Sequence, residues 1–394
     1  MTKLYLIRHA EAEGNLYRRA QGHFNANVTQ LGRRQIAALA ERFRDIPIAA
    51  LWSSDLYRTQ STAAAILRYH PKLTLRLSPE LREIDVGVWE DVPWGNIQRD
   101  YPEELAYFTN DPAQWSVPGG EPYLHVAERM KRSVLRLAEE NEGKTVAVVS
   151  HGLAIRALLC DHFGIPSAEI ARLPYGDNTS VTLLSVEDGR ITVEWYNDAS
   201  HLAGGLSTFE RQSWWRKTAP AAGEKKLYAE FDPLELPRER ELYSDCYART
   251  WMQSHGNLKG YVPLLYLRTA QSHAARDPRC VMKLRLGDAF AGIIELDPER
   301  GRENDAGWVS LLYVDPAMRS RRLGVQLIGH AVSYFRRAGR SALRLHVSET
   351  NTEAVGFYEH IGFRRIGTAD GVGGMLFLME MDIRPRALTP EELF

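Results

Sequence analysis

The sequence contains little of what marks a secreted, membrane-spanning or strongly charged protein. Its 394 residues include only 3 cysteines, and Cys160, Cys246 and Cys280 lie far apart. Such spacing predicts neither a disulfide framework nor a metal-binding cluster and is typical of a reducing cytoplasm. The opening apolar run Leu4–Ile7 is too short for a signal peptide, and no stretch of about 18 apolar residues occurs. We therefore expect a cytoplasmic protein without a metal or a membrane partner.

Charge of one sign is not in excess, because 49 Lys and Arg residues face 50 Asp and Glu residues and the formal net charge is −1. A balance this close to zero argues against a generic nucleic-acid binder. Hydrophobic residues make up 44% and charged residues 25%, which excludes a collagenous, low-complexity or disordered chain. Internal repeats are also absent, so at about 100–200 residues per domain the length predicts two domains of different fold.

In the first half, short apolar runs alternate with amphipathic segments, a pattern that predicts βα units and a mostly parallel sheet. We expect strands at Leu4–Ile7, Ala50–Trp52 and Thr145–Val149, helices after Thr29 and over Thr62–Tyr69 and Val126–Asn141, and a hairpin of Val181–Ser185 with Ile191–Tyr196. Residues 82–114, rich in aromatic, acidic and Pro residues, are expected to form an insertion beside the sheet.

The second half has a different order of apolar and amphipathic segments, which predicts an α+β domain with a mixed sheet. We expect strands at Lys226–Phe231, Val281–Leu286, Ala289–Leu296, Trp308–Val314, Ala342–Val347 and Met375–Met381, and helices at Glu235–Ser254, Val262–Ala275, Leu323–Ala338 and Thr352–Ile361. Between the halves the periodic apolar pattern gives way to Gly, Ser, Ala, Pro and charged residues. The predicted organisation is therefore a domain over 1–204, a linker over 205–225, a second domain over 226–385 and a tail over 386–394.

Two histidines follow two predicted strands of the first half. Arg8-His9 comes directly after one strand, and Ser150-His151-Gly152 comes directly after another. Because the carboxyl ends of parallel strands line one crevice, we expect the two histidines to face one another. A neutral imidazole is a nucleophile toward phosphorus, and Arg58 is a further cation that can clamp a phosphoryl group. Glu83 is the carboxyl that could protonate a leaving alkoxide.

An ordered series of motifs accompanies these residues and resembles the histidine phosphatase superfamily, also called phosphoglycerate mutase-like, over about residues 1–202. The series is Arg8-His9-Ala10-Glu11, Asn15, Gln21-Gly22, Thr29-x-Leu31-Gly32, Ser53-Ser54-Asp55-x-x-Arg58-Thr59, Glu83-Ile84-Asp85-x-Gly87-x-Trp89-Glu90, Pro118-Gly119-Gly120-Glu121 and Ser150-His151-Gly152.

This resemblance implies a three-layer α/β/α domain whose chemistry needs no metal. It implies that His9 is the phosphorylated nucleophile, that Arg8, Arg58 and His151 bind the phosphoryl group, and that Glu83 is the general acid. Asn15 and Gln21 are implied at the rim of the pocket, where a small phosphate ester would bind.

Within that family the choice is between a phosphatase and a mutase. Relatives that are mutases usually carry longer insertions between the acid and the second histidine, whereas here the interval is short, and the segment Glu83–Glu90 resembles broad-specificity and ribazole-phosphate phosphatases. We favour hydrolysis of a phosphate monoester and keep the mutase as an alternative. Several aromatic residues could wall the leaving group or simply pack together: Trp89, Trp94, Tyr101, Tyr107, Phe108 and Trp115.

A second constellation lies in the C-terminal half, where the strand Trp308–Val314 leads into a basic, Gly-containing turn that opens a helix. Such a turn presents backbone N–H groups and a positive dipole end to an anion. With the later motif Asn351-x-x-Ala354-x-x-Phe357-Tyr358, the turn resembles the GNAT acetyltransferase family over about residues 226–383. The resemblance implies an acetyl-CoA site formed by Leu312, Tyr313, Val314, Arg319, Arg321, Arg322, Leu323, Gly324, Val325 and Asn351.

The same resemblance implies that Tyr358 protonates the departing thiolate. The sequence departs from the family in its phosphate loop. In the alignment that we prefer, Arg322 stands where the loop normally has its first glycine, and the alternative frame Arg321-x-x-Gly324-x-Gln326 loses the other small residue. No general base is evident: Glu295 is possible, and His346 is expected to be a packed strand residue.

Together these observations predict a bifunctional enzyme that hydrolyses a small phosphate ester through a phosphohistidine and acetylates a small-molecule amine. Fusion raises the effective concentration of one site's product at the other, so both domains are expected to serve one pathway. The alternatives are a phosphatase with an acetyl-CoA-binding regulatory domain and a mutase fused to an acetyltransferase. A homo-oligomer is possible.

Overall fold

The computed structural model describes residues 1–211, 228–372 and 374–394. The described residues form two compact units: the first comprises 1–92, 97–211 and 385–394, and the second comprises 93–96 and 228–384. Of the linker expected over 205–225, only residues 205–211 lie in the described part, with helix α8 (Thr208–Arg211) at their end. The segment expected to be a tail, 386–394, groups with the first unit. None of the described helices is long and apolar enough to span a membrane.

The sheet of the first unit has the strand order β3-β2-β4-β1-β5-β6. These strands are β1 (Thr2–Arg8), β2 (Ala50–Ser53), β3 (Leu75–Leu77), β4 (Thr145–Ser150), β5 (Val181–Glu187) and β6 (Arg190–Asp198). The first four pair in parallel, and β5 and β6 add an antiparallel edge. The prediction of a mostly parallel sheet with a terminal hairpin is confirmed.

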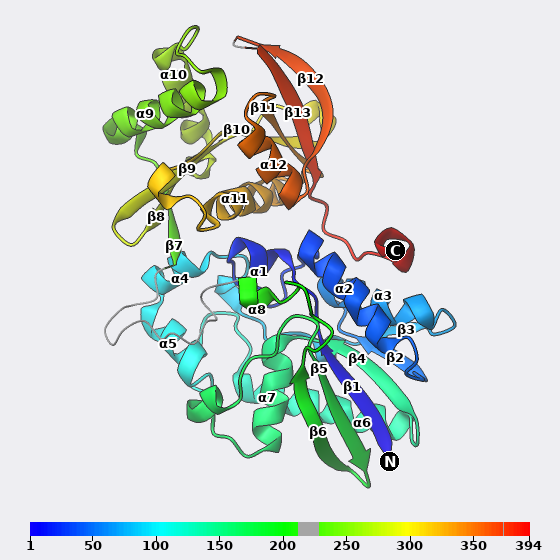
Figure 1. Cartoon of the computed structure of the whole chain (residues 1–394). Coiled ribbons are helices and arrows are strands. Elements are labelled where there is room, and N and C mark those ends of the chain that lie inside the picture. Colours follow the sequence, from blue (N-terminus) through cyan, green and yellow to red (C-terminus); the bar gives the residue numbers. More distant parts are fainter. Residues whose placement is uncertain (212–227, 373) are drawn as a thin grey trace. The chain divides into compact units, whose positions relative to one another are not determined.

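Helices cover both faces of this sheet, as Figure 1 shows. They are α2 (Gln30–Phe43) and α3 (Tyr57–Tyr69) on one face, and α6 (Tyr123–Glu140) and α7 (Gly152–His162) on the other. Thr29 caps α2, because its Oγ1 accepts the backbone N–H of Gly32 at 3.0 Å. The shorter helices of the unit are α1 (Glu13–Tyr17), α5 (Pro102–Asn110) and α13 (Pro390–Leu393), and α4 (Trp94–Asp100) begins in the stretch that groups with the second unit.

Helix α3 begins at Tyr57, five residues before the predicted start at Thr62. Its first five residues include Arg58, Thr59 and Ser61, which are polar and yet fully buried. Apolar periodicity cannot detect such a turn, because the residues on its inward face are not apolar.

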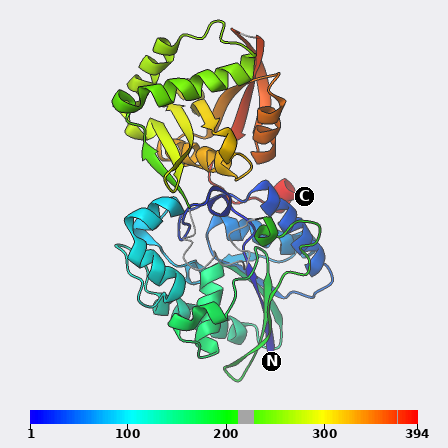
Figure 2. The same cartoon turned by 60° about the vertical axis from the view of Figure 1, so that its left-hand side comes forward.

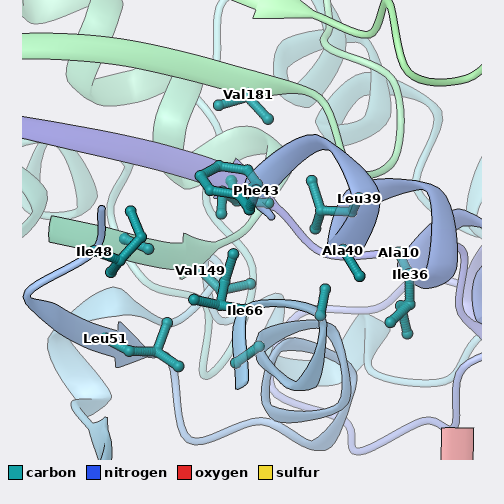
Figure 3. Packing of buried hydrophobic residues seen from close by; sticks show 14 of the residues in the cluster. Ala10, Ile36, Leu39, Ala40, Phe43, Ile48, Leu51, Ile66, Val149 and Val181 are labelled. Carbon is teal, nitrogen blue, oxygen red and sulfur yellow. The ribbon is translucent and has the colours of Figure 1, made fainter. Parts of the chain in front are cut away.

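The core between β-strands and the α2–α3 layer is made of residues that alternate along the strands. Leu51 and Val149 point from two neighbouring strands toward Phe43 on α2 and Ile66 on α3 (Figure 3), and Ile7 of β1 belongs to the same cluster. Successive strand residues point to opposite faces, so the buried Leu6 and Val148 lie on the α6–α7 side. Both faces of the central strands are thus apolar, which accounts for their continuous hydrophobic runs.

The second unit has the strand order β12-β13-β11-β10-β9-β8-β7. The strands are β7 (Ala229–Pro233), β8 (Val281–Leu286), β9 (Ala289–Asp297), β10 (Ala306–Val314), β11 (Ala342–Ser348), β12 (Arg364–Gly371) and β13 (Gly374–Asp382). Only the β10–β11 pair is parallel, which confirms the predicted mixed sheet.

Two strands of this sheet differ from the prediction. The strand expected at Lys226–Phe231 is observed as β7 from Ala229, and its first two predicted residues lie outside the described part. Strand β12 was not predicted, because it is a largely exposed edge strand whose polar sequence lacks apolar alternation.

The predicted helices of the second unit are present as α9 (Leu236–His255), α10 (Pro263–Arg276), α11 (Leu323–Arg337) and α12 (Thr352–Ile361). Helices α9 and α10 lie on one face of the sheet, and α11 and α12 lie on the other (Figure 2). The second unit is therefore also a three-layer structure.

Replacing Phe43 with Ala should destabilise the first unit strongly, because its fully buried ring fills the space between α2 and the sheet and meets the Tyr5 ring edge-on at 5.3 Å. We expect a loss of about 3–5 kcal/mol in the free energy of unfolding, measured by urea titration. Leu77→Ala is the control, because Leu77 is 46% exposed on an edge strand. Equal losses in the two variants would contradict this account of the core.

Candidate active sites

His9 and His151 come together at the carboxyl ends of two neighbouring strands. Strands β1 and β4 pair in parallel up to Arg8 and Ser150, and the His9 N–H donates to the Ser150 carbonyl at 3.0 Å. The two imidazole rings lie with their centroids 5.3 Å apart. The register of the parallel pair therefore carries both histidines into one site.

His9 is held as a neutral imidazole with a defined free nitrogen. Its Nδ1 lies 2.8 Å from the Ala10 carbonyl oxygen, which only accepts, so Nδ1 carries the proton and Nε2 keeps its lone pair. Burial, and then the nearby Arg58 and Arg8 cations, lower the pKa of His9 well below its ordinary value. The ring is thus uncharged at neutral pH.

Arg58 is a buried cation beside the two histidines. Its Nε donates to His151 Nδ1 at 3.2 Å, and its terminal N–H groups donate to the carbonyls of Phe24 at 3.1 Å and Gly22 at 2.7 Å. Burial lowers the pKa of Arg58 to about 10, which still leaves the guanidinium charged at neutral pH. Because Nδ1 of His151 accepts this bond, its Nε2 carries a proton and is a donor.

The loop that receives Arg58 is itself held by Glu90. The Glu90 carboxylate accepts the backbone N–H groups of Gly22, His23 and Phe24 at 3.2, 2.6 and 2.8 Å. A Cβ at position 22 would lie 2.4 Å from Glu90 Oε1 and 2.4 Å from the Ile84 carbonyl oxygen, so only glycine fits. Glu90 belongs to the predicted motif, but its supporting role was not predicted.

Two buried donors of the site have no acceptor among the described residues. They are Arg8 Nε and His151 Nε2. Arg8 Nη1 donates to the Gly176 carbonyl, and burial lowers the pKa of Arg8. Unpaired buried N–H groups are costly, and beside the Arg58 cation they suit the oxygens of an anion.

Glu83 is held against the start of α7. Its carboxylate accepts the backbone N–H groups of Leu153 at 3.1 Å and Ala154 at 2.9 Å, in the first turn after His151. This contact brings the predicted acid to the same strand end as His151, from a segment distant in sequence.

The backbone that carries Glu83 is held by Arg129, which sequence reasoning missed. Arg129 donates to the carbonyls of Glu80, Arg82 and Glu83 at 2.8, 2.7 and 3.0 Å and pairs with the Glu121 carboxylate at 2.8 Å. It lies on α6 with 4% of its surface exposed. Because one guanidinium donates to three main-chain carbonyls, it holds the backbone of residues 80–83 in place.

The two residues expected at the rim differ in their contacts. Asn15 Oδ1 accepts the backbone N–H of Ala12 at 3.1 Å and so helps to cap α1, whereas Gln21 Nε2 is buried without an acceptor among the described residues. Asn178 lies close to the same site and donates Nδ2 to the His9 carbonyl at 2.9 Å.

The aromatic residues of the insertion pack mainly against one another. Trp89 and Trp115 are buried, and Trp89 meets the rings of Tyr101, Phe108 and Trp115 with centroids 6.0, 5.6 and 5.5 Å away. The packing alternative considered for this cluster is the one that the structure supports.

In the second unit, two parallel strands separate at the predicted cofactor site. Strands β10 and β11 pair from Ala306 opposite Ala342 to Val309 opposite Leu345, and a register shift in the β10–β9 pairing follows Val309. From Leu311 onward β10 pairs with β9 alone, although it continues to Val314. The edge of Leu312–Val314 that faces β11 is thus open to an extended ligand.

The basic turn leads into the first turn of α11. Ser320 and Arg322 both have left-handed backbone, with φ of 61° and 59°, and Arg322 is the residue before the helix. This conformation favours glycine, which is the residue that the resemblance implies at the position of Arg322. Arg319 Nη2 donates to Gln253 Oε1 at 2.9 Å. The N–H groups of Leu323, Gly324 and Val325 belong to the helix start, where an anion is stabilised.

Tyr358 and Asn351 both lie on or beside α12. Burial raises the pKa of Tyr358, so its hydroxyl keeps its proton at neutral pH, and its ring lies between Phe357 and Phe363 with centroids 5.2 and 5.4 Å away. Asn351 Oδ1 accepts the backbone N–H of Ala354 at 3.2 Å, which makes it the cap of α12. The predicted role of Asn351 in holding the cofactor stays a prediction.

The possible base Glu295 belongs to a buried polar network. Its carboxylate accepts the Tyr243 hydroxyl at 2.7 Å and lies 2.8 Å from His273 Nδ1, and it is 1% exposed. His346 stands edge-on to the Trp308 ring at 4.9 Å, as expected of a packed residue.

Two families match the two units. Residues 4–199 match the histidine phosphatase superfamily (branch 1), and residues 236–363 match the acetyltransferase (GNAT) family. Phosphoserine phosphatase 1 of Hydrogenobacter thermophilus is 30% identical over 203 residues, which are 51% of this chain and 95% of that protein. A probable phosphoglycerate mutase GpmB of Escherichia fergusonii is 30% identical over 217 residues, 54% of this chain and 100% of that protein.

Among solved structures, that of Bacillus stearothermophilus YhfR matches with a TM-score of 0.50 and 30% identity, covering 51% of this chain and 100% of its own. The chain therefore belongs to the histidine phosphatase superfamily, and its residues 236–363 match the acetyltransferase (GNAT) family.

Proposed function

We propose that the N-terminal domain hydrolyses a small phosphate monoester through a phosphohistidine at His9. One observation carries the proposal: a buried neutral imidazole with a free Nε2 lies beside the Arg58 cation and the unpaired donors Arg8 Nε and His151 Nε2. A nucleophile without charge and a cluster of donors for oxygen anions are the two things that transfer of a phosphoryl group requires.

In the first step His9 Nε2 attacks phosphorus, the bond from phosphorus to the ester oxygen breaks, and Glu83 gives a proton to the leaving alkoxide. In the second step the Glu83 carboxylate takes a proton from water, which attacks the phosphohistidine. Inorganic phosphate leaves, and His9 and Glu83 return to their starting states. The donors of Arg8, Arg58 and His151 stabilise the transferring oxygens in both steps. No metal takes part in the proposed sequence.

Hydrolysis and mutase chemistry share the first step and differ in the acceptor of the phosphoryl group. Relatives named as a phosphatase and as a probable mutase are each 30% identical to this chain, so identity does not separate them. We favour water as the acceptor because the segment between Glu83 and His151 is short. The substrate is proposed to be a phosphorylated metabolite, and an amine-bearing one would link the two domains.

For the C-terminal domain we propose acetylation of a small-molecule amine. The residues fit acetyl-CoA in two respects: the open edge of Leu312–Val314 suits an extended chain with amide groups, and the start of α11 after Arg319, Arg321 and Arg322 suits a pyrophosphate. When bound, acetyl-CoA supplies a thioester whose acetyl group passes to the amine. Tyr358 holds a proton that it gives to the thiolate.

An alternative is an acetyl-CoA-binding regulatory domain without transfer. It is favoured because Glu295, the possible base, is buried and its carboxylate already accepts the Tyr243 hydroxyl. The cytoplasmic location, a shared pathway and a homo-oligomeric state also stay predictions.

His9→Ala should abolish release of inorganic phosphate from a panel of phosphorylated metabolites that includes amine-bearing ones. We expect a fall in kcat of at least about 1,000-fold, because the variant has no nucleophile. The exposed His360→Ala is the control, and acetyl-CoA binding by both variants checks that they fold. Unchanged phosphate release in His9→Ala contradicts the proposal, and phosphate transfer between carbon atoms of a phosphoglycerate, without release, identifies a mutase instead.

Arg129→Met should lower kcat for phosphate release about 10–100-fold with little change in KM, because the main chain of residues 80–83 loses the donor that aims Glu83. Arg132→Met is a matched control on the same helix, since its side chain is 61% exposed and lies 3.5 Å from Glu80. Both variants are assayed below their melting temperatures. A kcat equal to that of the control would exclude a positioning role for Arg129.

Tyr358→Phe should lower kcat for coenzyme A release about 10–1,000-fold without raising KM for acetyl-CoA, because only the proton donor is lost. Tyr334→Phe is the control. Tyr334 lies on α11, and its hydroxyl contacts Cys280 Sγ at 3.2 Å. Acetyl-CoA binding by calorimetry with no transfer to any amine would instead support the regulatory alternative.

A further inference from the structure

The last segment of the chain belongs to the phosphatase domain, although the acetyltransferase domain precedes it in the sequence. Residues 385–394, here called the C-terminal clasp, group with the first unit. Figures 1 and 2 both show helix α13, in red, beside α2 and α3. The sequence predicted only a tail at this point.

The clasp is anchored by apolar and ring contacts. Leu388 is 7% exposed and belongs to the core cluster with Ile36 and Ile66. The ring of Phe394 lies 4.1 Å from the Arg68 guanidinium. Clasp residues thus extend the main hydrophobic core between α2 and α3.

Two backbone N–H groups of the clasp bind two particular side chains of the domain. The Leu388 N–H donates to Ser61 Oγ at 2.9 Å, and the Arg386 N–H donates to Asn27 Oδ1 at 2.9 Å. Ser61 is fully buried on α3, and Asn27 lies in the loop that precedes α2. The clasp therefore connects a helix and a loop.

This helix and this loop are the two elements between which Arg58 is held. Arg58 is on α3, one turn before Ser61, and its carbonyl accepts the Thr62 hydroxyl at 2.7 Å, while Thr62 Oγ1 accepts the Ala10 N–H beside His9 at 2.9 Å. Its guanidinium donates to the carbonyls of Gly22 and Phe24 in the loop.

A second contact joins the same two elements near Arg58. The Tyr57 N–H, at the start of α3, donates to Asn25 Oδ1 in the loop at 2.9 Å. The contacts of the clasp thus join the same helix and loop that hold Arg58, the proposed phosphoryl-binding cation.

The family match of the phosphatase domain ends at residue 199 and does not include the clasp. Phosphoserine phosphatase 1 is matched over 95% of its length by 203 residues of this chain, and YhfR over 100% of its length by 51% of this chain. The clasp therefore lies outside the part of the chain that the family model describes.

We propose that the C-terminal clasp is a positioning element of the phosphatase site, which holds α3 and the loop of residues 22–28 at the separation that places the Arg58 guanidinium on the phosphoryl group. The inference rests on the proposed role of Arg58. Its consequence is that binding of phosphate by the N-terminal domain depends on residues that the chain supplies only after the acetyltransferase domain.

The test compares the full chain with a chain that ends at Arg384. Affinity for inorganic phosphate is measured by calorimetry, kcat and KM with a chromogenic phosphate ester, and stability by thermal unfolding. We expect the shortened chain to bind phosphate at least about 10-fold more weakly and to show a raised KM. A synthetic peptide of residues 385–394 added in trans should restore both, and the same peptide with Leu388→Asp is the matched control that should not.

Ser61→Ala in the full chain keeps the test decisive if the shortened chain does not fold. This variant removes the acceptor of the Leu388 N–H and leaves the core apolar contacts in place, and it should also raise KM and weaken phosphate binding, by about 3–10-fold. The contrary result is that both variants have a lowered melting temperature but the phosphate affinity and KM of the unchanged full chain. That result would overturn the proposal and show that the clasp only stabilises the fold.

The outcome is separable from that of the proposed function. If the full chain binds phosphate but releases none from any ester, hydrolysis is wrong, whereas the dependence of phosphate binding on the clasp is still measured. If the full chain does not bind phosphate at all, the placement of Arg58 in a phosphoryl site is wrong and the clasp proposal is wrong with it.

Discussion

The burial of the Arg58 guanidinium is the constraint on which the phosphatase domain depends. A buried cation is costly unless its donors are matched, and here they meet two main-chain carbonyls and one imidazole nitrogen. The loop that provides the carbonyls must therefore keep its path, which Glu90 ensures by accepting three consecutive backbone N–H groups. Burial, and then the same positive charge, lower the pKa of His9 and of His151 and so keep the imidazole of the proposed nucleophile neutral.

The reacting groups come from separate parts of the chain, and each is held by a different physical device. The parallel register of β1 and β4 places the histidines. Glu83 is held by the first-turn N–H groups of α7, and the carbonyls of its own segment are held by Arg129. Such preorganisation means that the site does not reorganise its dipoles during phosphoryl transfer.

The two domains solve the recognition of phosphate differently. In the N-terminal domain, side-chain cations and imidazole N–H groups lie in a buried site, which suits a group that is transferred. In the proposed acetyl-CoA site, main-chain N–H groups at a helix start and the end of a strand would hold the cofactor. Arg322 has the left-handed backbone conformation there, which glycine adopts at lower cost.

The sequence alone determined the two domains, the strand ends that carry His9 and His151, and the long amphipathic helices, because apolar periodicity and ordered local motifs are properties of neighbouring residues. Only the tertiary structure revealed the support of Glu83 by Arg129, the buried polar first turn of α3, the edge strand β12, and the clasp contact of Leu388 with Ser61. These features join residues that are far apart in the chain or lack apolar alternation. Their partners are set by packing and by the need to satisfy buried polar groups, and neither leaves a local pattern.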